Sequence, residues 1–149
     1  MKKVYTILPI IHAFVGIGAI AGGLAAILNP DAPLGMSTEV LKNSPFSNYL
    51  VPGIILLSVI GLGNIISALT FRLNSKYQGY ISSVFSWALV IWITVQCIML
   101  GSVVFLHVLY FIIGLFEALL SLILLFEHRL FPTNIIISLY EKMIKPKNT

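Results

Sequence analysis

The sequence predicts an all-α membrane protein, built as a bundle of four transmembrane helices. Two observations predict this fold. Of the 149 residues, 58% are hydrophobic and only 9% are charged, whereas soluble domains carry about 25% charged residues. The apolar residues also form long uncharged blocks, which suit a hydrocarbon core about 30 Å thick. The whole chain, residues 1–149, is therefore expected to form a single membrane domain.

Four apolar segments have the length of a transmembrane helix. The first two are separate blocks without charge, but the chain then stays apolar from Tyr80 to Phe126. As one helix this stretch would reach about 70 Å, more than twice the thickness of the hydrocarbon core. A turn at Gly101-Ser102 divides it, since glycine accepts the backbone angles that turns require. The expected spans are residues 5–28, 50–71, 80–100 and 103–126, which form two hairpins.

The positive charges predict which side of the membrane each segment faces. If the N-terminus lies inside, only Lys42 of the nine Lys and Arg residues lies outside. Cytoplasmic loops carry an excess of Lys and Arg, so both ends of the chain are expected in the cytoplasm. Short clusters of this kind indicate topology and lipid headgroup contacts, so we expect no nucleic acid partner. The inner residues are Lys2, Lys3, Arg72, Lys76, Arg129, Lys142, Lys145 and Lys147.

Two segments lie outside the expected spans. The outer loop, residues 29–49, is rich in Pro, Asn and Ser, which indicate turns. After the fourth span, the tail at residues 133–145 places apolar and charged side chains on different helical faces. This pattern predicts a short C-terminal helix that lies on the cytoplasmic surface of the membrane.

Glu117 lies inside the fourth span, where a charge at the helix centre costs at least about 2.5 kcal/mol. Such a group normally faces protein or water. Counting from the inner ends of the spans, at about 1.5 Å per residue, places four polar side chains in one layer. They are His12, Asn64, Ser86 and Glu117. Two interpretations stay open: a polar clasp that fixes helix register, or a proton or cation site in which Glu117 titrates.

Gln96 and His107 form a separate polar layer, nearer the outer face. His12 and His107 differ in depth by about 14 Å, so one haem iron cannot bind both imidazoles. The single cysteine, Cys97, has no disulfide partner in the chain and suggests no metal site. Phosphate loops, zinc-ligand spacings and paired catalytic carboxylates are absent from the sequence. We therefore expect no metal, no cofactor and no enzymatic activity.

The first span carries small residues along one face, where Gly16, Ala19 and Gly23 follow each other at helical spacing. Small residues let helix backbones approach closely, so these three are expected to form the main helix-packing surface. Gly18 and Gly22 form a second smooth strip on the same helix. A homodimer interface on this span is the alternative interpretation.

Three short motifs occur within about residues 10 to 125. They are Pro45-Phe46-Ser47-Asn48-Tyr49-Leu50-Val51-Pro52-Gly53, Gly61-Leu62-Gly63-Asn64 and Trp92-x-x-x-Gln96. Together they resemble a group of small uncharacterised bacterial four-helix integral membrane proteins. The resemblance implies a multi-pass protein of the bacterial plasma membrane and the four-span layout, but no activity. In layout the chain is also similar to DoxX-like proteins.

The leading hypothesis for function is a non-enzymatic helix bundle that binds membrane lipid or a partner membrane protein. It rests on the smooth surface of the first span, the small extramembrane portion and the lack of catalytic motifs. The alternative is a proton-coupled carrier or channel for a small solute, which would use Glu117. An intramembrane enzyme that acts on lipid ranks third.

Overall fold

In a computed structural model, which describes residues 2–73 and 75–144, the chain folds into helices and turns, and these residues form no strand. Four helical segments are long and apolar enough to cross a membrane. They are Lys2–Leu28, Leu50–Leu73, Gln78–Leu100 and Phe105–Glu127. The prediction of an all-α fold with four such helices is confirmed, and the ends of the helices differ from the expected spans by only a few residues.

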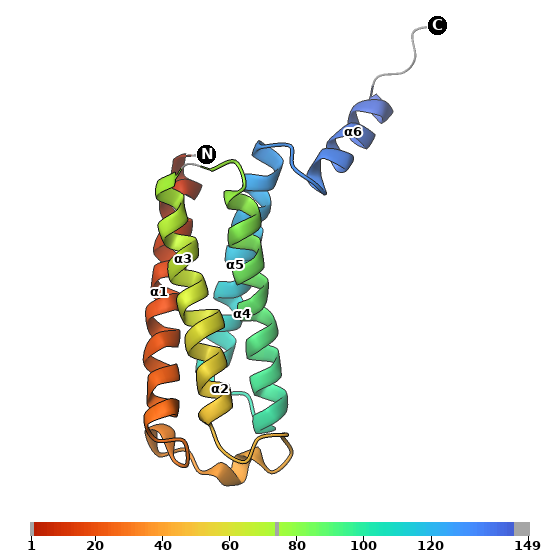
Figure 1. Cartoon of the computed structure of the whole chain (residues 1–149). Coiled ribbons are helices and arrows are strands. Elements are labelled where there is room, and N and C mark those ends of the chain that lie inside the picture. Colours follow the sequence, from red (N-terminus) through yellow and green to blue (C-terminus); the bar gives the residue numbers. More distant parts are fainter. Residues whose placement is uncertain (1, 74, 145–149) are drawn as a thin grey trace, which may run out of the picture.

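The helices pair along their lengths. The first, α1 (Lys2–Leu28), packs against the whole second segment, and α4 (Gln78–Leu100) packs against α5 (Phe105–Glu127). Figure 1 shows all four segments as one elongated bundle. The start of α1 and the last helix, α6 (Thr133–Ile144), lie at one end, while the loop at residues 29–49 lies at the other. These are called below the terminal end and the loop end.

The second membrane-length segment is not one regular α-helix. It begins as α2 (Leu50–Ile55), continues as the π-helical stretch η3 (Leu56–Leu62) and returns to α-helix in α3 (Gly63–Thr70). A 3-10 turn, η4 (Phe71–Leu73), closes it. The sequence predicted a single helix here. π-Helical geometry is rare and is frequently found at functional sites, so η3 is a candidate functional segment.

The long loop folds against its end of the bundle. It contains two short 3-10 helices, η1 (Pro33–Gly35) and η2 (Thr38–Leu41). The buried Tyr49 fastens it, because its hydroxyl donates to the carbonyl oxygen of Ser37 at 3.1 Å and its backbone N–H donates to Pro30 at 2.9 Å. These hydrogen bonds hold the loop in a defined position at the loop end of the bundle.

The turn between α4 and α5 lies where the sequence placed it. Gly101 ends α4 with a positive φ of 58°, a left-handed conformation that glycine adopts at little cost. At the terminal end, α6 follows α5 outside the bundle, as Figure 1 shows. This helix corresponds to the tail expected at residues 133–145, of which Lys145 lies outside the described residues.

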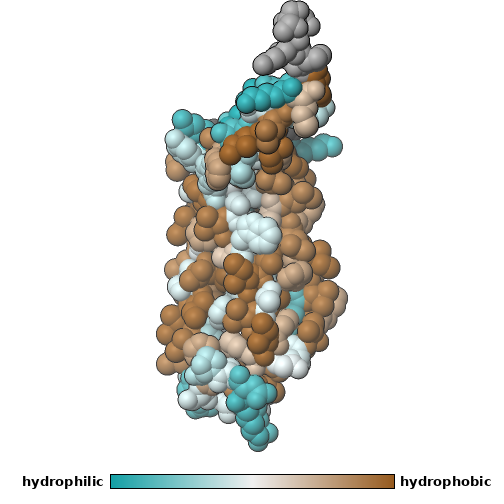
Figure 2. Space-filling model, turned by 90° about the vertical axis from the view of Figure 1, so that its right-hand side faces the viewer, coloured by the Kyte–Doolittle hydropathy of each residue, from teal (hydrophilic) through white to brown (hydrophobic). Residues whose placement is uncertain are grey.

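The lateral surface of the bundle is apolar. Figure 2 shows a broad hydrophobic belt on the visible face, with hydrophilic residues gathered towards the two ends. Large aliphatic side chains point outwards in this belt, and Ile10 and Ile17 of α1 are 62% and 65% exposed. Soluble monomers rarely expose apolar patches of this extent, so the surface is compatible with a multi-pass membrane helix bundle.

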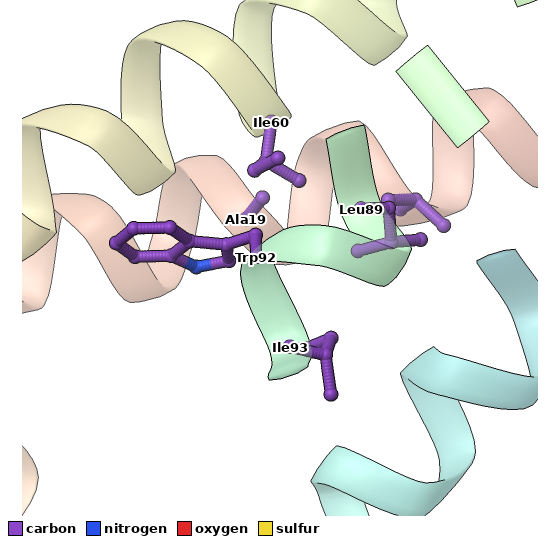
Figure 3. Packing of buried hydrophobic residues seen from close by; sticks show 6 residues of the cluster. Ala19, Ile60, Leu89, Trp92 and Ile93 are labelled. Atoms are coloured by element: carbon purple, nitrogen blue, oxygen red, sulfur yellow. The ribbon is translucent and has the colours of Figure 1, made fainter. Parts of the chain in front are cut away.

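The main core cluster joins α1, η3 and α4. Ala19, Trp92 and Ile93 pack together there, as Figure 3 shows. Val15, Ile60 and Leu89 belong to the same cluster and are at most 2% exposed.

Candidate functional site

Three of the four polar residues predicted to share a layer meet inside the bundle. His12 of α1, Asn64 of α3 and Glu117 of α5 all have no exposed surface. His12 Nδ1 lies 2.6 Å from Asn64 Oδ1 and 3.1 Å from Glu117 Oε1. These three residues are called below the polar centre.

The hydrogen bonds of Asn64 define the tautomer of His12. The Asn64 amide group donates through Nδ2 to the carbonyl oxygen of Ile60 at 2.8 Å. Its Oδ1 is therefore the acceptor that faces His12, and His12 Nδ1 must carry the hydrogen. In the neutral imidazole the free lone pair then lies on Nε2.

Glu117 sits beside this hydrogen bond without sharing it. Its Oε1 is close enough to His12 Nδ1 for an ion pair, but the N–H of His12 points to Asn64, so no aligned hydrogen bond forms with the carboxyl group. Both carboxyl oxygens and His12 Nε2 are buried without a partner among the described residues. Unpaired buried polar groups cost free energy, so the polar centre is a candidate site.

The Ser86 side chain takes no part in the hydrogen bonds of the polar centre, contrary to the expected grouping of four. It is buried, but its hydroxyl donates to the carbonyl oxygen of Ser82, one turn earlier on α4, at 2.7 Å. Ser82 also joins a network that the sequence analysis did not single out. Its hydroxyl lies 3.3 Å from that of Ser67 on α3, and the Gln78 side chain donates to the Ser67 carbonyl oxygen at 3.2 Å. Depth counting along the second and third spans could have paired Ser67 with Ser82.

A cavity of about 440 Å³ lies between the helices at the loop end. We call it the loop-end cavity. On α1 it is lined by the strip of small residues at Gly18 and Gly22. Pro33, Leu34 and Met36 of the folded loop line its outer part. The lining is largely aliphatic.

Polar side chains also line the loop-end cavity: Gln96 of α4, His107 and Tyr110 of α5, and Tyr49, whose hydroxyl is already bonded to Ser37 of the loop. Gln96 and His107 form the polar layer expected near the outer face, and both line this cavity. The ring of His107 accepts the backbone N–H of Val104 at Nδ1, at 3.3 Å, so the neutral ring carries its hydrogen on Nε2. The cavity thus contains neutral hydrogen-bonding groups in an apolar setting.

An aliphatic layer separates the loop-end cavity from the polar centre. Val15, Ile60 and Leu89 line the cavity and are almost fully buried. His12 lies one helical turn from Val15 on α1, and Asn64 lies one turn from Ile60. The polar centre is therefore directly beyond the floor of the cavity, and the Asn64–Ile60 hydrogen bond connects the two.

The small residues predicted to pack α1 lie at close helix contacts. A methyl group on Gly16 would come within 2.7 Å of the Ile65 side chain. One on Gly23 would come within 2.8 Å of the backbone nitrogen of Leu57. Ala19 lies in the core cluster. The small-residue faces of α1 are therefore occupied by this chain's own helices and by the cavity.

No protein-family profile, no curated protein and no solved structure matches this chain.

Proposed function

We propose that this protein is a non-enzymatic membrane protein that binds one lipid-like molecule in the loop-end cavity. The molecule would have an apolar body and a neutral, hydrogen-bonding polar group. The observation that carries this proposal is the cavity itself, a largely aliphatic space of about 440 Å³ with Gln96, His107 and Tyr110 on its wall.

The size of the cavity favours a small molecule over a partner protein. Binding pockets for small molecules measure roughly 300–1,000 Å³. A single turn of an α-helix, about 10 Å across and about 5.4 Å long, would already occupy a space of this volume. The lipid alternative of the leading hypothesis therefore agrees better with the structure than the partner protein.

The charges on the cavity wall favour a neutral polar group on the ligand. No Lys or Arg lines the cavity in the described part of the chain, so a phosphate would find no cation there. Gln96, His107 and Tyr110 can instead donate hydrogen bonds to a carbonyl, ester or hydroxyl oxygen. Acylglycerols and quinones are ligands of this chemical class.

The same proposal includes the orientation of the bundle in a bacterial plasma membrane. The positive charges favour both ends of the chain in the cytoplasm, which would place the loop-end cavity in the outer leaflet. α6 would lie on the inner surface, since Ile135, Leu139 and Met143 expose apolar area on a helix outside the bundle.

Trp92 provides a direct test of ligand binding. It is buried in the core cluster with Val15, Ile60 and Leu89, which line the cavity. The only other tryptophan, Trp87, is 51% exposed. The experiment uses a Trp87→Phe variant, so that all tryptophan fluorescence comes from Trp92. A dibrominated diacylglycerol quenches tryptophan only at short range. We expect saturable quenching of Trp92 when this probe is added to protein in mild detergent.

Two variants of α1 separate the cavity from the lipid-facing surface. Gly22→Leu places a side chain in the cavity, where the first added carbon would meet only the flexible Leu56 side chain, at 3.3 Å. This variant should fold and should lose the saturable quenching. Ala21→Leu enlarges the neighbouring exposed position and should leave the quenching unchanged. Equal quenching in both variants would show that the probe binds outside the cavity.

A second candidate function, a proton-coupled carrier for a small solute, is favoured by the unpartnered Glu117 carboxyl group beyond the cavity floor. A carrier of this kind must open its site alternately to both sides of the membrane. The aliphatic layer of Val15, Ile60 and Leu89 is the barrier that would have to part. Accumulation of a solute driven by a pH gradient in proteoliposomes would distinguish this candidate from simple binding.

A further inference from the structure

We propose that His12 and Glu117 form a proton-binding site inside the bundle, and that η3 couples this site to the loop-end cavity. The first half of the proposal stands on the geometry of the polar centre alone. The coupling rests on the proposed function, because it needs a ligand in the cavity.

The site is better suited to a proton than to a metal cation. Hard cations such as Ca²⁺ and Mg²⁺ take six or more oxygen ligands. Here Glu117 offers two oxygens, while Asn64 Oδ1 already accepts the His12 N–H. That N–H also brings a positive dipole to the place where a cation would sit. Within residues 2–73 and 75–144, no three His, Cys, Asp or Glu side chains gather as a metal site would require.

Two atoms of the polar centre can take up a proton. His12 keeps its hydrogen on Nδ1, so an added proton binds at Nε2 and gives an imidazolium. Glu117 accepts a proton on either free oxygen and becomes a carboxylic acid. With one proton the pair has no net charge, either as an ion pair or as two neutral groups. Loss of that proton leaves one negative charge, and gain of another leaves one positive charge.

The polar centre lies in an apolar interior, where the described residues place no other charged group nearby. A net charge in an apolar interior is costly, so a proton that enters or leaves changes how the pair interacts with the helices around it. α3 contributes Asn64 and α4 contributes serines, and the described residues of these helices add no charged group at this depth. The next titratable side chains along α1 and α5 are Tyr5 and Tyr110, each two turns away.

η3 connects the proton site to the cavity. Leu56 and Ile60 of η3 both line the cavity, and the carbonyl oxygen of Ile60 accepts the Asn64 amide that holds His12. A ligand that presses on Ile60 therefore acts on the Asn64–His12 hydrogen bond. Coupling between two sites is reciprocal, so protonation of the pair must change ligand affinity by the same factor.

Infrared spectroscopy in lipid nanodiscs tests the proton site without any ligand. Between about pH 5 and pH 9, a buried carboxyl band that titrates should be present in the wild type and absent in Glu117→Gln. Glu127→Gln, the same change at an exposed position of α5, should keep it. A spectrum without a titrating buried band, or one that Glu117→Gln leaves unchanged, would overturn the proposal.

His12→Gln provides a second test, which holds even if Glu117→Gln fails to fold. It retains the carboxyl group and removes the group that can carry the neighbouring positive charge. The carboxyl titration curve should then differ from that of the wild type. An unchanged curve would show that the two side chains do not share a proton site.

Quenching of Trp92 by the brominated diacylglycerol, repeated across the same pH range, tests the coupling. Affinity should change about fivefold or more over the titration, and Glu117→Gln should remove this dependence. If the carboxyl group titrates but ligand affinity does not change with pH, the coupling is contradicted and the proton site is not. Absence of binding at every pH, with titration intact, would contradict the proposed function and its coupling but support the proton site.

Discussion

Gly18 and Tyr110 show how one missing side chain positions a polar group. The hydroxyl of Tyr110 lies against Gly18, so that a methyl group at this position would collide with it. Tyr110 can therefore reach across the bundle from α5 to the wall of the loop-end cavity. Gly18 serves here to admit a polar side chain rather than to bring two backbones together.

Tyr49 makes the loop sensitive to alkaline pH. Burial raises the pKa of its hydroxyl above the ordinary value of 10.0. As pH rises above 10.0, the released loop loses this proton before the docked loop does. The stability contributed by neutral Tyr49 is thus fully present below that pH and is lost as pH rises through the pKa of the docked state.

We therefore predict that the loop loosens above about pH 10 and that Tyr49→Phe removes this pH-dependent step. A nitroxide spin label at the exposed Lys42 would report the change as increased mobility. Tyr140→Phe, at an exposed position on α6, should behave like the wild type. Identical label mobility on both sides of the transition would contradict the role given to Tyr49.

The depth of each residue along its helix was enough to predict the polar centre. It was not enough to predict which hydrogen bonds each side chain forms. Depth along straight helices brings His12, Asn64 and Glu117 into one layer because rise per residue is nearly constant. Ser86 has the same depth, yet its hydroxyl bonds to its own helix at Ser82. A short serine side chain in a helix readily does this, and depth alone cannot reveal it.

At the scale of elements, η3 is the feature that the sequence did not predict. Its residues look like an ordinary apolar helix, and the spans were predicted only from length and hydropathy. η3 packs closely against α1, where a methyl group on Gly61 would come within 2.8 Å of Ile20. Such packing between segments distant in sequence has no local signal.

Adjacent glycines on α1 allow a matched test of helix packing. A methyl group on Gly23 would meet the Leu57 backbone nitrogen at 2.8 Å and the Gly53 carbonyl oxygen at 2.9 Å, and backbone atoms cannot move aside cheaply. We predict that Gly23→Ala destabilises the bundle by about 1–3 kcal/mol. Gly22→Ala should be neutral or stabilising, since its nearest neighbour is a flexible side chain at 3.3 Å. Thermal unfolding in detergent measures both, and equal melting temperatures would contradict this packing.

At the scale of the whole molecule, the distribution of apolar residues along the chain was sufficient to predict four long helices. It was not sufficient to predict the loop-end cavity. Hydropathy and the turn at Gly101 define four apolar helices. The cavity depends on how the helices rotate about their axes and on where the loop from Pro30 to Tyr49 docks. Neither is specified by periodicity, because exposed and buried positions in this chain are similarly apolar.

Orientation is tested by cysteine labelling in a background that lacks Cys97. Cysteines at Lys3 and Lys76 should react with an impermeant reagent only from the cytoplasmic side. One at Glu39, on the loop, should react only from outside. Reaction at Lys76 from outside would contradict the orientation proposed for the bundle.

Native mass spectrometry of protein purified in mild detergent tests the occupancy of the loop-end cavity most directly. The wild type should retain one lipid-like molecule per chain, and Ala21→Leu should retain it as well. Gly22→Leu, which fills the space beside Leu56, should fold normally but carry no bound molecule. A wild-type protein without any bound molecule, or equal retention in the two variants, would contradict a binding function for the cavity.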